Sequence, residues 1–308
     1  MGRSSDLQSV YAGIDAGGTT FKCGLFNDRA EIIAKQRIPV TTPEETFENC
    51  IAFFRAAIKD ETQRLESFGI ASFGPIDIDP ASDSYGTILR TPKAGWSHTS
   101  ITDKFASAFQ LPVFVDTDVN GALLAELTLG NASESRTAAY VTIGTGIGAG
   151  IWANNGFIGQ PSHPEFGHIA VKRHENDLDA QSVCPFHDDC LEGLASAASV
   201  QARYGKPETL PASHPAWDVE AYYLAQACRT LYLSLRTDRI VLGGGLMLAQ
   251  GLLSKVRASF SDQLSRYANG DPDFADTMIV TPGLGDDAGV TGAMLVGRRG
   301  YDQKERRI

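Results

Sequence analysis

Residues 10–26, VYAGIDAGGTTFKCGLF, place two apolar runs on either side of a short turn rich in glycine and threonine. The runs Val10–Asp15 and Phe21–Phe26 have the length and apolar content of buried β-strands. The turn joins strand to strand, so it is a hairpin turn and does not open a helix. A second polar turn and a third strand, Glu31–Val40, follow. The start of the chain therefore predicts three consecutive strands, the first two joined by a glycine turn.

The same pattern recurs at residues 138–153, AAYVTIGTGIGAGIWA. Strands are predicted at 138–143 and 148–153, with a glycine turn between them and a third strand from Phe157. Helices alternate with strands after the first copy, whereas a loop-rich insert and further helices follow the second. This alternation predicts an α/β fold with a largely parallel sheet covered on both faces. Two such units predict two lobes with a cleft between them.

Local signals place the other elements. A helix is predicted after Thr42, because Thr42 can cap it, Pro43 suits its first turn and Glu45 completes a capping box. The remaining predicted strands are 68–73, 113–115, 239–242 and 278–281, and the remaining predicted helices are 101–109, 122–129, 219–235, one from 246, and 288–297.

Composition limits the possible partners. The chain has 308 residues and a formal net charge of −10, which argues against a nucleic-acid or anionic-membrane surface. Met1–Val10 contains no apolar run of the kind found in signal peptides, and we expect these residues to form a disordered tail. No apolar stretch is long enough for a transmembrane helix. Five cysteines do not suggest a disulfide framework. The sequence thus predicts a cytoplasmic protein.

The two glycine turns have the composition of phosphate-binding loops. Consecutive glycines let backbone amides face an anion, and threonine hydroxyls add donors. Asp15 is placed to hold Mg²⁺ through water, although a plain hairpin is the alternative for this turn. Neither turn has the P-loop lysine pattern or the dinucleotide spacing. The triplet Gly243-Gly244-Gly245 suits either the close approach of a nucleotide or tight helix–strand packing.

A metal constellation lies in the insert, residues 161–215. Cys184, His187 and Cys190 are spaced three residues apart, with His168 upstream. Four such ligands make a closed tetrahedral set, which is typical of structural zinc and argues against a zinc hydrolase. His174 is the alternative fourth ligand. The other cysteines lie on apolar strand or helix patterns and are expected to be buried packing residues; they are Cys23, Cys50 and Cys228.

Longer blocks carry a family resemblance. They are Asp15–Thr20, Phe73–Asp77, Thr91–Trp96, Asp116–Gly121, Thr145-Gly146, Ser162–His168, Cys184–Gly193 and the triplet 243–245. Together they resemble the ROK sugar kinases, fructokinase branch, of the hexokinase/actin-like superfamily. The resemblance implies a two-lobed, ribonuclease H-like ATPase fold with duplicated βββαβα units and a zinc-bearing loop insert. It also implies a smaller lobe, 1–120 plus 289–308, a larger lobe, 121–288, and a homodimer.

The same resemblance assigns roles to residues. Asp118 is implied as the catalytic base, although an N-cap aspartate is the alternative. ATP and Mg²⁺ are implied at the nucleotide residues Asp15, Gly17, Gly18, Thr19, Thr20, Lys22, Gly144, Thr145, Gly146, Gly243, Gly244 and Gly245. The implied sugar residues are Gly74, Pro75, Trp96, Thr117, Asn120, Glu165, His168 and Glu192. The implied zinc ligands are His168, Cys184, His187 and Cys190.

Some of these assignments carry alternatives. Many ROK kinases have Asn where this chain has Thr117, so Asn120 is the alternative for that sugar contact. The usual ROK pattern has cysteine at the place of His187. The fructokinase branch has histidine there, as this chain does. Trp96 and Lys93 lie in the segment that resembles fructokinases, so either residue is a candidate for determining sugar specificity. For Trp96 the alternative is an ordinary packing role.

The resemblance implies phosphorylation of D-fructose by ATP to fructose 6-phosphate. The alternatives are a relaxed hexokinase that also takes mannose or glucose, and a catalytically silent sugar sensor. ROK repressors carry a DNA-binding domain before the first phosphate strand. Only about ten residues precede that strand here, and the charge is acidic, so a repressor is disfavoured.

Overall fold

The computed structural model describes residues 7–59, 62–91, 93–265, 267 and 273–305. The chain divides into two compact units. Unit 1 comprises the described residues of Met1–Glu126, Gly159–Ser162 and Leu284–Ile308, and unit 2 comprises those of Leu127–Ile158 and His163–Gly283. Each unit is built on its own five-stranded sheet.

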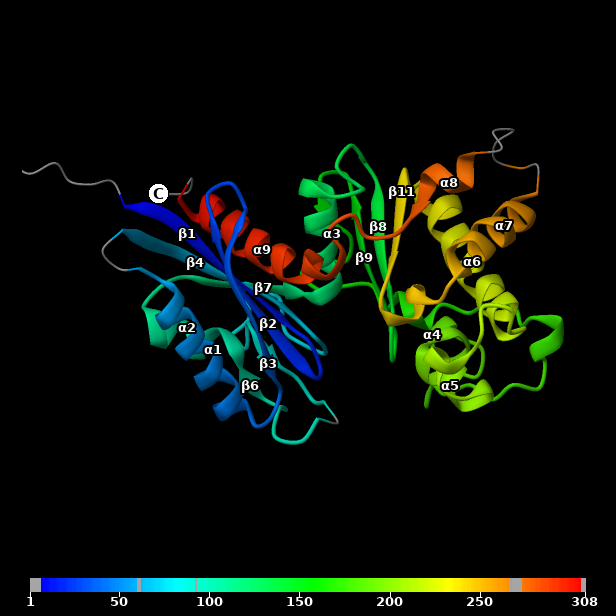
Figure 1. Ribbon diagram of the computed structural model, residues 1–308, viewed down its shortest axis with the longest axis horizontal. Helices are drawn as coiled ribbons and strands as arrows, with labels where there is room; N and C mark the ends of the chain where they lie inside the picture. The colour runs from blue at the N-terminus through cyan, green and yellow to red at the C-terminus, as the bar shows by residue number, and fades with distance from the viewer. Residues whose placement is uncertain (1–6, 60–61, 92, 266, 268–272, 306–308) are drawn as a thin grey trace, which may run out of the picture. The chain divides into compact units, whose positions relative to one another are not determined.

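The sheet of unit 1 has the strand order β3-β2-β1-β4-β7 (Figure 1). Strands β1, β2 and β3 are joined as antiparallel hairpins, whereas β4 and β7 run parallel to β1. Its elements are β1 (Gln8–Ala16), β2 (Thr20–Asn27), β3 (Ile32–Pro39), α1 (Pro43–Ala57), β4 (Gln63–Ser72), α2 (Ile101–Phe109), β7 (Val113–Thr117), α3 (Asp118–Leu129) and α9 (Ala288–Glu305), with the small hairpin β5 (Thr87–Ile88) and β6 (Thr99–Ser100). The end of α3, from Leu127, belongs to unit 2.

Neighbouring residues of β4 show how the sheet is covered. Phe68 packs its ring against Phe54 of α1 and Phe105 of α2. Gly69 faces the opposite way, because a Cβ there would lie 1.8 Å from the Ala293 carbonyl oxygen of α9. Helices α1 and α2 therefore cover one face of the sheet, and α9 lies so close to the other that only glycine fits at position 69.

Unit 2 repeats this topology. Its sheet has the order β10-β9-β8-β11-β12, with antiparallel hairpins followed by parallel neighbours. The elements are β8 (Ala138–Ile143), β9 (Ile147–Ala153), β10 (Gly156–Phe157), η1 (Phe166–His168), η2 (Glu175–Asp177), α4 (Leu191–Ala195), α5 (Ala197–Tyr204), η3 (Pro207–Thr209), α6 (Ala216–Leu235), β11 (Arg239–Gly243), η4 (Gly245–Leu248), α7 (Leu252–Leu264), α8 (Phe274–Met278) and β12 (Ile279–Val280); η5 (Gly285–Asp287) precedes α9 in unit 1.

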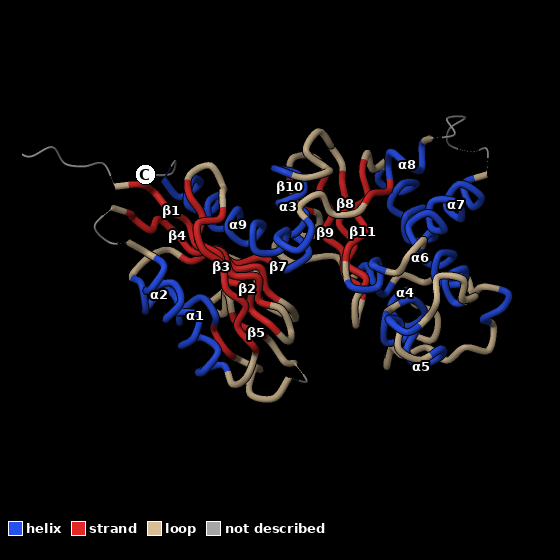
Figure 2. Tube along the Cα trace, viewed as in Figure 1, coloured by secondary structure: helices blue, strands red, loops and turns tan. Residues whose placement is uncertain are grey.

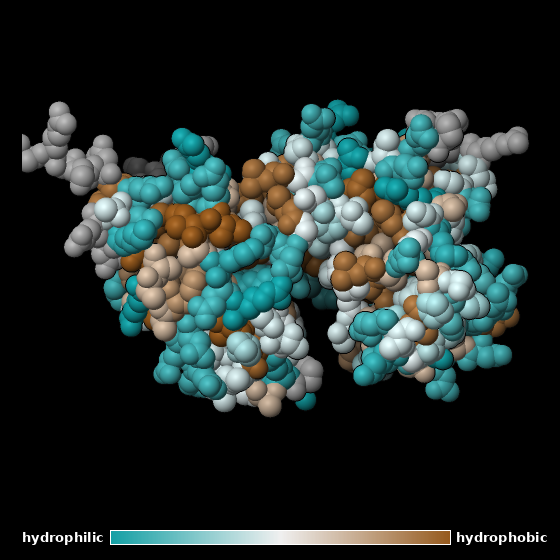
Figure 3. Space-filling view, in the orientation of Figure 1, coloured by the Kyte–Doolittle hydropathy of each residue, from teal (hydrophilic) through white to brown (hydrophobic). Residues whose placement is uncertain are grey.

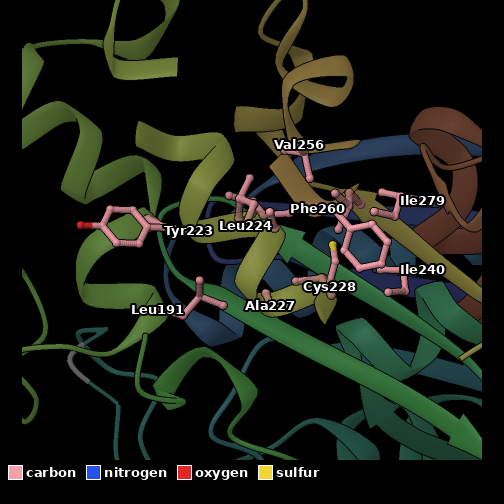
Figure 4. Packing of buried hydrophobic residues seen from close by; sticks show 14 of the residues in the cluster. Leu191, Tyr223, Leu224, Ala227, Cys228, Ile240, Val256, Phe260 and Ile279 are labelled. Carbon is pink, nitrogen blue, oxygen red and sulfur yellow. The ribbon is translucent and has the colours of Figure 1, made fainter. Parts of the chain in front are cut away.

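The core of unit 2 lies between its sheet and α6 and α7. Figure 4 shows Cys228 of α6 close to Phe260 of α7 and to Ile240 and Ile279 of the sheet, and all four are fully buried. Burial raises the pKa of the Cys228 thiol to about 12, so it stays protonated. The prediction that Cys23, Cys50 and Cys228 are buried packing residues is confirmed.

Most predicted elements are confirmed, and α1 has the predicted cap, with Thr42 Oγ1 accepting a hydrogen bond from the Glu45 amide. The prediction of a largely parallel sheet is wrong, because the antiparallel hairpins at the start of each unit make both sheets mixed. The insert is more helical than predicted, since it contains α4 and α5 among its loops (Figure 2). The helix predicted from Leu246 is a 3₁₀ turn followed by α7.

The prediction of a disordered tail at Met1–Val10 is wrong for its last three residues, because β1 begins at Gln8 and pairs with β4. Residues 1–6 lie outside the described residues. Figure 3 shows a mainly hydrophilic surface with separate small hydrophobic areas. None of the helices in the described ranges combines the length and hydrophobicity needed to cross a membrane.

Candidate active site

The first glycine turn closes the β1–β2 hairpin. The Gly17 amide donates to the Thr20 carbonyl at 3.1 Å, and a Cβ on Gly17 would lie 2.9 Å from that oxygen. Gly18 and Thr19 are exposed, and a Cβ on Gly18 would meet nothing within 4 Å. Glycine at 17 thus serves the turn itself, whereas Gly18 leaves backbone open to an anion.

Asp15 lies at the end of β1 beside this turn. Burial raises the pKa of its carboxyl group, and the nearby Lys22 opposes that rise from 3.8 Å away. A Cβ on Gly289 of α9 would lie 2.3 Å from Asp15 Oδ2. Any larger residue at position 289 would therefore clash with the Asp15 carboxylate. Such a carboxylate can hold a magnesium ion through the ion's water shell, and the open turn beside it offers amide donors to an anion.

The second turn, between β8 and β9, is braced by a carboxylate. The Gly144 amide donates to the Gly146 carbonyl at 2.9 Å, and Glu192 Oε2 accepts from the Ile147 amide at 2.9 Å. A Cβ on Gly146 would lie 2.6 Å from that oxygen. Thr145 at the tip is exposed. The sequence assigned Glu192 to the sugar only, and its contact with the turn was missed because 45 residues separate the partners.

The glycine triplet divides into two roles. A Cβ on Gly243 would lie 2.1 Å from the Tyr140 hydroxyl oxygen. Gly244 has φ +90°, and its Cβ would lie 2.3 Å from the Ile143 carbonyl oxygen. A Cβ on Gly245 would meet nothing within 4 Å. Packing against β8 explains the first two glycines, and Gly245 alone leaves room for a ligand.

The turn from β7 into α3 presents Asp118. Thr117 Oγ1 accepts from the Asn120 amide at 3.2 Å, so Thr117 caps the helix, and the N-cap alternative for Asp118 is wrong. Asp118 Oδ1 accepts from the Val119 amide at 2.9 Å. Asn120 Nδ2 donates to Asp116 Oδ1 at 2.7 Å.

The predicted sugar contacts of Thr117 and Asn120 need correction. Thr117 is 3% exposed and Asn120 is fully buried, so neither offers a surface to a ligand. Gln160 Nε2 also donates to Asp116, at 3.3 Å, and ties the segment 159–162 to the same corner. These hydrogen bonds fix the start of α3 and therefore the position of Asp118.

Trp96 is a packing residue. It is fully buried, its ring packs against Phe21, Phe47 and Phe73, and its Nε1 donates to the Thr41 carbonyl at 3.2 Å. The prediction of Trp96 as a sugar residue is therefore replaced by its packing alternative.

Lys93 connects the same segment to the first turn. Its ammonium donates to the Gly18 carbonyl and stands 5.5 Å from the ring centroid of Phe73 and 5.7 Å from that of Trp96. Burial lowers the pKa of Lys93. The sequence placed Lys93 only near the sugar residues, not at the phosphate turn.

The four predicted zinc ligands come together in unit 2. One ligand atom from each of His168, Cys184, His187 and Cys190 lies within 4.8 Å of the other three. Cys184 Sγ is 3.8 Å from His168 Nδ1 and 3.6 Å from His187 Nδ1. Ligands of tetrahedral zinc, with bonds of about 2.0–2.3 Å, stand roughly 3.4–3.8 Å apart. The cluster therefore has dimensions that suit one zinc ion.

The remaining predicted residues are partly placed. His174 is outside the cluster, because its Nδ1 accepts from the Asn176 amide and its ring packs on Tyr222. The Glu165 side chain is 72% exposed, with Oε1 3.8 Å from His163 Nε2. Gly74 and Pro75 are exposed in unit 1.

The predicted site residues are shared between the units. Unit 1 carries Asp15, the first turn, Lys22, Gly74, Pro75, Trp96, Thr117, Asp118 and Asn120, and unit 2 carries the second turn, Glu165, His168, the other residues of the Cys/His cluster, Glu192 and the triplet 243–245.

Comparison with known proteins decides the family. Residues 11–299 match the ROK family. The chain belongs to the ROK family. Among its ROK relatives, a fructokinase of Zymomonas mobilis is 42% identical over 292 residues, which cover 94% of this chain and 96% of the relative. A fructokinase of Streptococcus mutans is 40% identical, over 92% of this chain and 96% of the relative.

A solved ROK structure agrees in fold. The ROK hexokinase of Thermus thermophilus superposes with a TM-score of 0.78 at 23% identity, over 96% of this chain and 99% of the other. The chain thus has the α/β, actin/hexokinase-like fold of ROK sugar kinases, with mixed sheets.

Proposed function

We propose that this ROK protein phosphorylates D-fructose with ATP to give fructose 6-phosphate and ADP. The observation that carries the proposal is Asp118, held at the end of β7 by the capped turn of Thr117 and by the Asp116–Asn120 hydrogen bond. Its carboxylate is thus placed by buried neighbours, as a catalytic base requires. Fructokinase relatives at 40–42% identity support fructose as the substrate.

The reaction needs a base and a site for phosphates. The oxygen of the sugar 6-hydroxyl attacks the γ-phosphorus of ATP, the bond from that phosphorus to the bridging oxygen breaks, and ADP leaves. Asp118 accepts the hydroxyl proton. The open amides of Gly18 and Thr145 donate to phosphate oxygens. Magnesium supplies positive charge to the phosphates when bound, and Asp15 would hold it through water.

Polar side chains of unit 2 are the proposed sugar ligands. Carboxylates suit a polyol, because each accepts hydrogen bonds from neighbouring hydroxyls, and Glu165 and Glu192 provide them. His168 Nδ1 faces Cys184, which leaves Nε2 for a hydroxyl. Gly74 and Pro75 add exposed backbone. Trp96 acts indirectly, by supporting the segment that carries Lys93.

We propose structural zinc in the insert, held by His168, Cys184, His187 and Cys190. Four protein ligands close the shell, so the ion would not activate water. It would instead order the insert and direct α4, which begins directly after Cys190 and carries Glu192, toward the second turn.

The proposal extends to organisation and location. The two compact units would be the lobes, with residues 121–126, 159–162 and 284–288 added to the smaller lobe that the sequence predicted as 1–120 plus 289–308. The protein would act in the cytoplasm as a homodimer.

The test is ADP release with ATP and Mg²⁺ on fructose, mannose and glucose in turn. Wild type should turn over fructose, and Asp118→Asn should lose at least about a hundredfold in kcat. Asp103→Asn, an exposed aspartate in the first turn of α2, is the matched control and should keep its activity. Equal turnover of the three sugars would indicate the relaxed hexokinase, and no turnover would indicate a silent sensor.

A further inference from the structure

Three charged side chains form a row across the sheet of unit 1. Asp15 of β1 is directly opposite Lys22 of β2, and Lys22 is directly opposite Arg37 of β3. Opposed residues of antiparallel strands point to the same face, so the three side chains are neighbours there. Lys35 lies two residues before Arg37 and shares that face.

A pair of aspartates before α9 meets this row. Lys22 Nζ donates to Asp286 Oδ1 at 2.9 Å and to the Asp286 carbonyl oxygen at 3.1 Å. Arg37 donates to the other carboxylate oxygen of Asp286. Asp287 pairs separately with Lys35, at 2.9 Å. Asp286 therefore gathers the two cations nearest Asp15, and Asp287 takes the more distant one.

The position of Lys22 follows from these contacts. Its ammonium is hydrogen-bonded to Asp286 but stands 3.8 Å from Asp15 Oδ2, an ion pair without a hydrogen bond. Asp15 is the more buried of the two carboxylates, at 18% side-chain exposure against 63%. A buried carboxylate attracts an ammonium more strongly than an exposed one, because water screens the exposed pair. Without Asp286, Lys22 would therefore close on Asp15.

We propose that Asp286 is a positioning residue of the nucleotide site: it holds Lys22 away from Asp15 and thereby keeps the Asp15 carboxylate open to the magnesium ion of a bound nucleotide. The inference rests on the proposed function, because it takes Asp15 as the magnesium-facing group. A contact ion pair between Lys22 and Asp15 would compete with the cation for the same oxygens. Loss of Asp286 should therefore raise the magnesium concentration that nucleotide binding requires.

The chain offers a matched control. Asp287 is the next residue, precedes the same helix and pairs with a lysine on the same sheet face, but that lysine is on β3 and not opposite Asp15. Asp287→Asn removes one surface ion pair and leaves Lys22 paired with Asp286. Asp286→Asn instead removes the ion pair that holds Lys22. Exposed pairs of this kind contribute little to stability, so both variants should fold.

The experiment is calorimetric titration of ADP at a series of Mg²⁺ concentrations, without sugar or turnover. Asp286→Asn should raise the Mg²⁺ midpoint about five- to tenfold, and Asp287→Asn should change it less than twofold. In a Lys22→Met background the competing charge is gone, so adding Asp286→Asn should change the midpoint less than twofold. An unchanged midpoint in Asp286→Asn, or the same rise in the Lys22→Met background, would overturn the inference.

The result also separates this inference from the proposed function. A purely structural role of Asp286 would lower the melting temperature and leave the Mg²⁺ midpoint unchanged, which counts against the inference. Wild-type protein that binds no ADP at any Mg²⁺ concentration would overturn both. Protein that binds Mg·ADP but does not phosphorylate fructose would overturn the proposed function alone, and the midpoints would still decide the inference.

Discussion

The two glycine turns have the same place in two sheets of the same topology, but they differ in charge. The second residue pair from the first turn is Asp15 opposite Lys22, whereas the second pair from the second turn is Thr142 opposite Gly148. The strands at the far edge of the two sheets, β7 and β12, also lead into different sequences. Strand β7 leads into Asp118, and β12 leads into Thr281 and Pro282.

The supports of the turns differ in the same way. In unit 1, Asp286 acts on the side chain of Lys22, and in unit 2, Glu192 accepts directly from the Ile147 amide. One βββαβα frame thus carries an aspartate–lysine pair beside its first turn and a carboxylate bound to a backbone amide beside its second. On the proposed function, both turns contribute amides to the phosphates, the first copy also handles the metal and the proton, and the second contributes side chains to the sugar.

The largest effect is expected at the brace of the second turn. Glu192→Ala removes the acceptor of the Ile147 amide and a proposed sugar ligand. Two charge-assisted hydrogen bonds of about 2 kcal/mol each correspond to a loss of about a thousandfold in kcat/KM. Steady-state kinetics with fructose and ATP measure it, with exposed Glu208→Ala of the same unit as control. A loss under tenfold would mean that the second turn needs no carboxylate.

Zinc removal should disorder the insert of unit 2 and leave the structure of unit 1 unchanged. Among the described residues the Cys/His cluster proposed to hold zinc lies wholly in unit 2. Chelation should lower activity about a hundredfold, since groups that orient a site are worth about 10–100-fold. Limited proteolysis should then cut first within residues 161–190. Metal analysis should find one zinc per chain, lost in Cys190→Ser and kept in Cys228→Ala. Full activity in zinc-free protein would refute this role.

The glycine triplet separates packing from ligand approach. Gly244→Ala should lower the free energy of unfolding by about 2 kcal/mol or more, because position 244 has φ +90° and its Cβ would meet the Ile143 carbonyl. Gly245→Ala has open space and should change stability by less than about 0.5 kcal/mol. It should still raise the KM for ATP if nucleotide lies there. Urea unfolding and ATP kinetics test the pair, and equal destabilisation would contradict this division.

A smaller effect is expected at Glu220 of α6. The residue is 1% exposed, and neither carboxylate oxygen has a hydrogen-bond partner within the described parts of the chain. Burial raises its pKa well above the ordinary value. A carboxyl group with a raised folded-state pKa loses stability as pH rises from the unfolded pKa through the folded one. Glu220→Gln should therefore gain stability over wild type as pH rises from 5 to 8. Thermal unfolding at both pH values measures the gain, and a constant difference would argue against it.

Local signals in the sequence predicted much of this fold. The hairpins of both units and the capped start of α1 depend on residues close together in the chain, and they are found where predicted. The five-residue α4 was not predicted, since a helix so short has no apolar period and depends on packing.

The site was predictable only in part. Spacing alone was enough to group the three predicted ligands Cys184, His187 and Cys190. Burial of Trp96 and Asn120 depends on distant neighbours, so their predicted contact with sugar was not reliable. The pairing of Lys22 with Asp286 joins residues 264 positions apart, and only the alternating cations of β3 and the aspartate pair before α9 hint at it.

Product analysis by phosphorus NMR, with fructose, ATP and Mg²⁺ at equal starting concentrations of the two substrates, tests the central claim most directly. The account predicts one fructose 6-phosphate for each ADP formed, and no such signal with Asp118→Asn in the same time. Free phosphate in place of a sugar phosphate, phosphorylation at another hydroxyl, or an unchanged product yield in Asp118→Asn would contradict it.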